Sequence, residues 1–97
     1  MKLFHKELHA FVRLMDRKLQ ENAHKGHWRD EANGFTPYLL FDRLMEEVDE
    51  LRDELILLRD GKGDGAAIGL ECADVANFAL MIQDITSTVL PVKEARG

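Results

Sequence analysis

Apolar side chains recur at steps of three and four residues along three long stretches of this chain. That spacing gives a helix one apolar face, whereas a half-buried strand would alternate at every second residue. The first stretch, residues 3–23, carries Phe4, Leu8, Phe11, Val12, Met15 and Leu19, and the second, residues 37–60, carries Phe41, Leu44, Met45, Val48, Leu51, Leu55 and Leu58. The third, residues 65–89, is apolar around most of its circumference, so we expect it to be largely buried. The sequence therefore predicts an all-α fold with a three-helix protomer.

Capping residues and helix breakers mark the ends of these predicted helices. Thr36-Pro37 begins the second, because threonine caps free N–H groups and proline suits the first helical turn. The glycine-rich run 61–65 ends it, and Asp64 is the expected cap of the third helix. A proline stops that helix and leaves residues 91–97 as an expected frayed tail. With 97 residues the chain has room for one domain.

Charge and cysteine content narrow the classes of partner. Residues 37–60 contain eight acids and three arginines, which accounts for the whole net charge of −5. Duplex DNA and anionic membranes both require a basic face, so neither is an expected partner. A single cysteine, Cys72, cannot form an internal disulfide, the start of the chain lacks a secretory signal, and no run approaches the ~20 apolar residues of a membrane span. We expect a soluble, cytoplasmic protein.

Polar side chains interrupt the third helix at successive steps of three. Glu71, Asp74 and Asn77 form one narrow stripe on an otherwise apolar segment. A buried carboxylate costs several kcal/mol unless it is paired or binds a cation. Two explanations stay open at this point: an arginine or lysine from a neighbouring helix neutralises the acids, or a metal ion does.

The second helix supplies acids rather than bases. Glu47, Glu50 and Glu54 follow one flank of its apolar stripe. If the two helices form an antiparallel hairpin, that flank faces Glu71 and Asp74, and like charges raise one another's pKa values. Divalent cations with a preference for oxygen resolve this conflict, and Mg²⁺ (or Mn²⁺) suits a few carboxylates and a phosphate.

These residues also resemble a known family. Residues 46–50 match the pattern EExxE, and residues 71–74 match ExxD. Together they resemble the MazG-like all-α nucleoside triphosphate pyrophosphohydrolases, relatives of dimeric dUTPases and phosphoribosyl-ATP pyrophosphohydrolases. The resemblance implies hydrolysis of (deoxy)nucleoside triphosphates to a monophosphate and pyrophosphate. It implies a homo-oligomer, dimer or tetramer, that completes the helical bundle, and it implies four metal ligands, which are Glu47, Glu50, Glu71 and Asp74.

Further residues are candidates for catalysis and substrate binding. Glu46, with Glu47 and Glu50, is a candidate for catalysis, although its position on the helix also fits a solvated side chain. In the expected loop 24–35, Lys25 can neutralise a phosphate and Trp28 offers a face on which a base can stack. Alternatively, Trp28 fills the core and Lys25 is solvated. Asn77, on the acidic stripe, completes the substrate-binding candidates.

Two other functions stay open. One is a narrower pyrophosphohydrolase that acts on dUTP, dCTP or phosphoribosyl-ATP, because base specificity depends on the shape of the pocket rather than on the metal ligands. The other is a non-catalytic helical module for oligomerisation or regulation, in which the acids only keep the surface soluble. The second alternative predicts a stability that does not depend on Mg²⁺.

Overall fold

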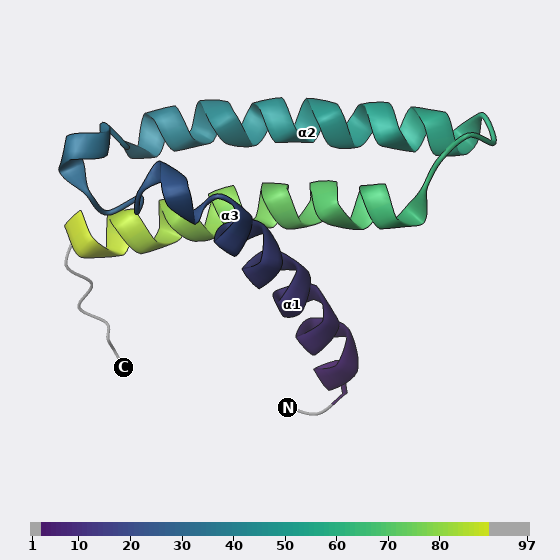
Figure 1. Cartoon of the computed structure of the whole chain (residues 1–97), viewed down its shortest axis with the longest axis horizontal. Helices are drawn as coiled ribbons and strands as arrows, with labels where there is room; N and C mark the ends of the chain where they lie inside the picture. Colours follow the sequence, from purple (N-terminus) through teal and green to yellow (C-terminus); the bar gives the residue numbers. More distant parts are fainter. Residues whose placement is uncertain (1–2, 90–97) are drawn as a thin grey trace.

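The computed structural model describes residues 3–89, and within them every regular element is helical. Helix α1 spans His5–Glu21, α2 spans Pro37–Arg59 and α3 spans Gly65–Val89 (Figure 1). The expected loop contains two short 3₁₀ turns, η1 at Ala23–Lys25 and η2 at Glu31–Asn33. The predicted all-α, three-helix fold is confirmed for this part of the chain. The frayed tail expected at 91–97 lies outside the described residues.

The ends of α2 and α3 follow from local chemistry. The Thr36 side chain accepts a hydrogen bond from the backbone N–H of Leu39 at 3.1 Å, directly before Pro37 in the first turn. Gly61 ends α2 with a φ of +78°, which residues with a side chain rarely adopt. Asp64 directly precedes α3, and its Oδ1 accepts a hydrogen bond from the backbone N–H of Ala66 in the first turn at 3.0 Å.

Helix α1 is shorter than expected. It begins two residues after the predicted start and ends at Glu21, where Asn22 turns the chain. The Nδ2 atom of Asn22 donates to the carbonyl oxygen of Lys18 at 2.9 Å, which also accepts from the backbone N–H of Asn22 at 3.2 Å, so backbone and side chain of Asn22 both bind the helix end. The chain then continues into η1 rather than adding another α-helical turn.

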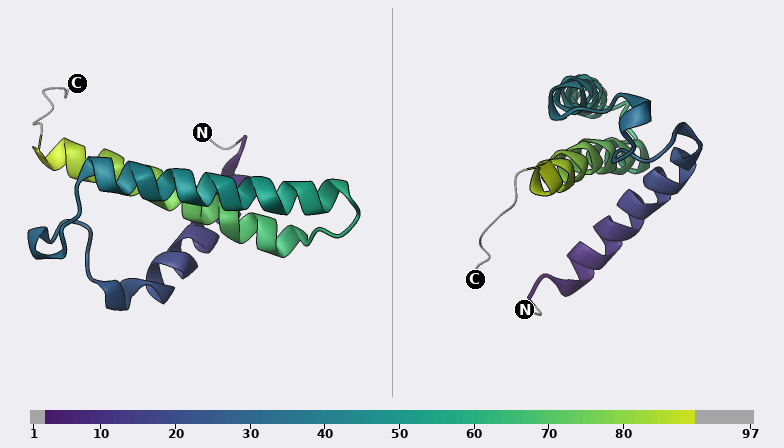
Figure 2. Two further views of the ribbon diagram at one scale, coloured as in Figure 1. Left: turned by 90° about the horizontal axis from the view of Figure 1, so that it is seen from above. Right: turned by 90° about the vertical axis from the view of Figure 1, so that its left-hand side faces the viewer.

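Helices α2 and α3 form an antiparallel hairpin, and α1 crosses α3 on the other side (Figures 1 and 2). Only the C-terminal part of α1 approaches α3, while its N-terminal end points away from the hairpin. A hydrogen bond of 3.0 Å from Nδ2 of Asn77 to the carbonyl oxygen of Met15 joins the two helices at the crossing. The two helices therefore have the antiparallel arrangement in which the acidic flank of α2 can face Glu71 and Asp74.

The hydrophobic core of a single chain is thin. Among the described residues only Leu40 and Ala73 are fully buried apolar side chains. The expectation that α3 is largely buried is therefore wrong for one chain, because two helices cannot enclose a third. The radius of gyration is 15.5 Å, against about 12.5 Å for a compact domain of this length. Large apolar side chains remain exposed on every helix and in the two residues before α1: Leu3, Phe4, Leu8, Val12, Tyr38, Phe41, Met45, Leu55, Ile56, Leu57, Leu58 and Leu80.

Helix α3 also corrects the expectation that no segment is apolar enough to span a membrane. Within the described residues, Gly65–Ser87 reaches that threshold by length and composition, with a mean hydropathy of 1.4. The expectation counted only uninterrupted apolar residues and overlooked that glycine, alanine and a few polar residues are compatible with a high average. The core helices of soluble proteins have the same property, so it assigns no location.

Candidate functional site

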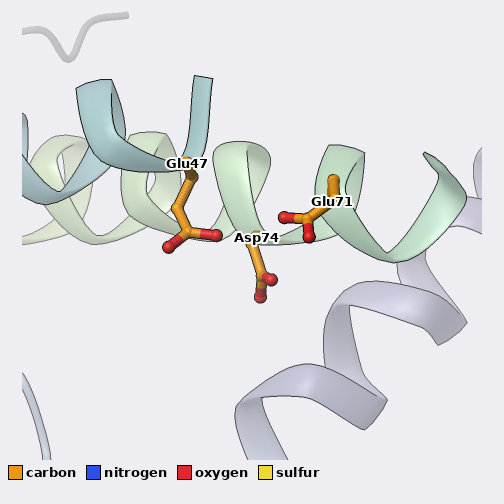
Figure 3. A group of neighbouring side chains, drawn as sticks. All are labelled: Glu47, Glu71 and Asp74. Atoms are coloured by element: carbon orange, nitrogen blue, oxygen red, sulfur yellow. The ribbon is translucent and has the colours of Figure 1, made fainter. Parts of the chain in front are cut away.

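The hairpin brings together three carboxylates from two helices. Glu47 reaches from α2 toward Glu71 and Asp74 on α3 (Figure 3). One carboxylate oxygen of each lies within 4.8 Å of the others, and all three side chains are half-buried. Opposite ligands of one Mg²⁺ ion are about 4.2 Å apart, so small rotations would let these oxygens share an ion. We call these three residues the carboxylate cluster.

Burial and like charge act together on the pKa values of the carboxylate cluster. Burial is the main cause that raises the pKa of Glu47 to about 7, and the negative charges of Glu50, Asp74 and Glu71 add to it. The pKa of Glu71 is also raised, first by burial and then by Glu50 and Asp74. A divalent cation would oppose both shifts, because it favours the ionised carboxylates.

One atom of the cluster lacks any hydrogen-bond partner. Oε1 of Glu71 is buried and no donor within the described residues reaches it. A buried acceptor without a donor is rare and costly in folded proteins. The ligand chemistry that would satisfy it, together with two further carboxylate oxygens, is that of a hard cation such as Mg²⁺ or Mn²⁺. The residues present therefore fit a metal ion.

Lys18 on α1 is a neighbour that the sequence analysis missed. Its Nζ lies 3.6 Å from Oδ2 of Asp74 and 3.6 Å from Oε1 of Glu21. One of the two open explanations was a basic partner for the acids of α3, and Lys18 is such a partner. It is a single lysine beside three carboxylates, so it cannot neutralise all of them. A signal existed: Lys18 follows Met15 by three residues and Phe11 by seven, which places it on the apolar face of its helix.

A cleft of about 540 Å³ opens beside the carboxylate cluster. Its size lies within the usual range of small-molecule sites. The cleft is lined by all eight residues predicted from the sequence as site residues, which are Lys25, Trp28, Glu46, Glu47, Glu50, Glu71, Asp74 and Asn77. Further lining residues with useful chemistry are Lys18, Phe35 and Arg43. The cleft thus combines acids, bases and aromatic rings from all three helices and the loop.

The structure separates the predicted acids into two groups. Glu47, Glu71 and Asp74 converge, whereas Glu50 lines the cleft and acts on the cluster through its charge without being among the converging oxygens. Glu46 is exposed, and Arg43 Nη1 lies 3.4 Å from its Oε1. This ion pair agrees with the solvated alternative for Glu46.

Asn77 is tied to the fold rather than left free for a ligand. It is only 4% exposed, and its Nδ2 makes the bond to Met15 that fixes α1 on α3. Its Oδ1 is buried without a hydrogen-bond partner within the described residues. A contact from Asn77 to substrate would therefore use the oxygen, because the nitrogen is occupied.

The loop before α2 is fastened to α3 through Asp84. Trp28 Nε1 donates to Oδ2 of Asp84 at 2.9 Å, and Arg29 donates to both of its carboxylate oxygens at 2.6 and 2.5 Å. These bonds, first from Arg29 and then from Trp28, lower the pKa of Asp84 to about 2. We call this group the Asp84 clamp. Trp28 is half-buried and lines the cleft, so it is not a fully buried core residue.

The sequence analysis missed both Asp84 and Arg29. Asp84 follows Asn77 by seven residues, or two helical turns, and so continues the polar stripe along α3. This spacing was a readable signal for Asp84. Its partner Arg29 lies in the loop, and the path of a loop cannot be predicted from helical periodicity.

Comparisons with known proteins add no relative. No family model matches the chain, and neither the curated proteins nor the solved structures compared contain a significant match. The inference of function therefore depends on the geometry of the cleft and on the motif resemblance.

Proposed function

We propose that this chain is a MazG-like enzyme that hydrolyses (deoxy)nucleoside triphosphates to a monophosphate and pyrophosphate, with Mg²⁺ or Mn²⁺ as cofactor. The observation that supports this most directly is the convergence of Glu47, Glu71 and Asp74 at a cleft that also contains lysines and aromatic rings. Such a combination offers oxygen ligands for a cation, positive charge for phosphates and flat surfaces for a base.

Each group has a distinct role in this proposal. The carboxylate cluster holds the metal ion, and Glu50 adds negative charge beside it. When bound, the ion would lower the pKa of an attacking water and neutralise charge on the leaving pyrophosphate. Glu50 and Glu46, both exposed, are the candidates that accept the proton of that water.

The loop side of the cleft would bind the rest of the nucleotide. Lys25 is exposed and can meet a phosphate oxygen, while the aromatic residues Trp28 and Phe35 both line the cleft. Because the Asp84 clamp already holds the indole N–H, the contribution of Trp28 is its ring face. Stacking on that face discriminates poorly between bases, so the substrate could be broad or restricted to one of dUTP, dCTP and phosphoribosyl-ATP by other lining residues.

We also infer that the active form is a homo-oligomer. The exposed apolar side chains on all three helices and the two-residue apolar core leave a single chain short of buried surface. A dimer or tetramer that covers these faces would supply it. Light scattering at micromolar concentration is expected to show a dimer or larger, and a monodisperse active monomer would contradict the inference.

A screen of nucleoside triphosphates with Mg²⁺, monitored by pyrophosphate release, tests the proposed activity. The wild type is expected to release pyrophosphate from at least one of them, and the Glu71→Gln variant from none. Asp53→Asn is the matched control, since Asp53 is an exposed acid of α2 outside the cleft. Release of pyrophosphate by Glu71→Gln at the wild-type rate would contradict the proposal.

A second function, a non-catalytic oligomerisation module, is favoured by one specific observation. The ion pair between Lys18 and Asp74 already neutralises part of the cluster without any metal ion. This alternative predicts that Mg²⁺ leaves the melting temperature unchanged and that no nucleotide in the screen is hydrolysed. The metal response of stability therefore separates the two functions.

A further inference from the structure

Lys18 occupies an unusual place for a lysine. It extends from α1 into the wall of the cleft, and its side chain is 21% exposed. The bond between Asn77 and Met15 fixes α1 on α3 only three residues before it. Among the ion pairs of the described residues, its contact with Asp74 is the one that joins a basic side chain to the carboxylate cluster.

The ion pairs of Lys18 are loose. Both of its N–O distances are 3.6 Å, longer than the roughly 2.7–2.9 Å of a direct charge-assisted hydrogen bond. Its charge is shared between Asp74 and Glu21 on different helices. By contrast, Arg29 binds Asp84 through two short hydrogen bonds. A lysine held this loosely, on a flexible stem with three donors, can exchange one anionic partner for another.

The position of Lys18 indicates which anion would replace Asp74 as its partner. A divalent cation at the cluster would take over the charge of Asp74 and repel the ammonium group beside it. The nearest new partner in the cleft would be the phosphate that arrives with the cation. We propose that Lys18 is a phosphate-binding residue: its ammonium balances Asp74 in the metal-free protein and transfers to a phosphate oxygen when metal and phosphate bind. The inference depends on the proposed function for the identity of the phosphate compound.

This exchange predicts effects of opposite sign in one variant. Lys18→Met keeps the apolar stem and removes the charge. Mn²⁺ alone should then bind about two- to fivefold more tightly, since a competing cation at a partly exposed ion pair has been removed. Pyrophosphate in the presence of saturating Mn²⁺ should bind about tenfold more weakly, since it loses a charge-assisted contact. A residue that only packs α1 on α3 would move both affinities in the same direction or neither.

Titration calorimetry on the full chain, first with Mn²⁺ and then with pyrophosphate, measures both affinities. Lys6→Met is the control, because Lys6 is an exposed lysine of the same helix far from the cluster. Lys18→Gln also removes the charge but keeps a polar end, and it replaces Lys18→Met as the informative variant if the latter does not fold. The same opposite shifts, relative to Lys6→Gln, are expected of it, and shifts in the same direction or no shift overturn the exchange.

The outcomes distinguish this inference from the proposed function. Weaker Mn²⁺ binding or unchanged pyrophosphate binding in Lys18→Met overturns the role of Lys18, even if the wild type hydrolyses nucleotides. Opposite shifts in a protein that hydrolyses no nucleotide support Lys18 as a phosphate-binding residue and contradict the pyrophosphohydrolase. Absence of Mn²⁺ binding in the wild type overturns both.

Discussion

Glu71 and Asp74 lie in the first half of α3, and Asp84 lies ten residues after Asp74 on the same helix. All three are half-buried carboxylates, yet their surroundings are opposite. In the carboxylate cluster, burial and like charges raise the pKa values of Glu47 and Glu71. In the Asp84 clamp, hydrogen bonds from Arg29 and Trp28 lower the pKa of Asp84 to about 2.

The contrast shows that the opposing element decides what an acid on a helix does. Asp84 faces a loop that supplies a guanidinium and an indole N–H, so the carboxylate fixes that loop in place. Glu71 and Asp74 face α2, which supplies another carboxylate, and among the ion pairs of the described residues Lys18 on α1 is the base that reaches them. The clamp is thus complete within the chain, whereas the cluster has capacity for a cation.

The largest expected effect of breaking this contrast is on catalysis. Glu71→Gln and Asp74→Asn each remove one charged ligand of the cluster and should lower the rate of pyrophosphate release by at least about a hundredfold. Without metal, Glu71→Gln should melt no lower than the wild type, because the substitution also removes repulsion. Steady-state kinetics and thermal melts on the same samples measure both properties. Full activity in either variant would move the metal away from the cluster.

Substitution in the Asp84 clamp should lower stability and leave metal binding intact, the opposite of substitution in the carboxylate cluster. Asp84→Asn removes the charge that Arg29 binds and weakens the acceptor of the Trp28 indole. We expect a melting temperature lower by several degrees and a shifted fluorescence emission of Trp28, which is the chain's only tryptophan. Mg²⁺ should raise the melting temperature of Asp84→Asn as much as that of the wild type, because Asp84 lies outside the carboxylate cluster. An unchanged melt and emission would mean that the clamp does not hold the loop.

The smallest expected effect is a pH dependence of stability that belongs to the cluster. Glu47 has a pKa of about 7 in the folded chain against 4.5 for the unperturbed group, so the folded state binds more protons between these values. Acidification from pH 8 to 5 should therefore stabilise the metal-free protein, by a few degrees of melting temperature. The difference between wild type and Glu47→Gln isolates this contribution from other titrating groups.

Saturating Mg²⁺ should flatten or reverse this trend, because the ion binds the ionised carboxylates and competes with protons. Melts from pH 8 to 5 with Mg²⁺ and with a chelator provide the comparison. The same pH slope under both conditions, or in wild type and Glu47→Gln, would contradict the raised pKa as a property of the metal site.

Local patterns made most of the fold predictable. The helical period defined α2 and α3, and the capping groups of Thr36 and Asp64 act within a single turn, so neither needs tertiary information. Helical phase also predicted that Glu47 would face Glu71 and Asp74 across the hairpin. Glu50 lies one turn further and only borders the converging oxygens, a difference that phase alone does not resolve.

The remaining features depend on contacts between distant segments. Lys18 reaches Asp74 only because α1 crosses α3 at Met15 and Asn77, and Arg29 reaches Asp84 only because the loop folds back. The apolar pattern of α3 predicted burial that a single chain does not provide. That pattern records which surfaces are apolar, and not which chain covers them.

Calorimetric titration of Mn²⁺ into the metal-free wild type, Glu71→Gln and Asp84→Asn tests the contrast between cluster and clamp most directly. The wild type and Asp84→Asn are expected to bind Mn²⁺ with similar affinity, because Asp84 lies outside the cluster. Glu71→Gln should bind at least about tenfold more weakly, since it loses a charged ligand. A wild type that binds no Mn²⁺, or equal binding by Glu71→Gln and the wild type, would contradict the assignment of the metal to Glu47, Glu71 and Asp74.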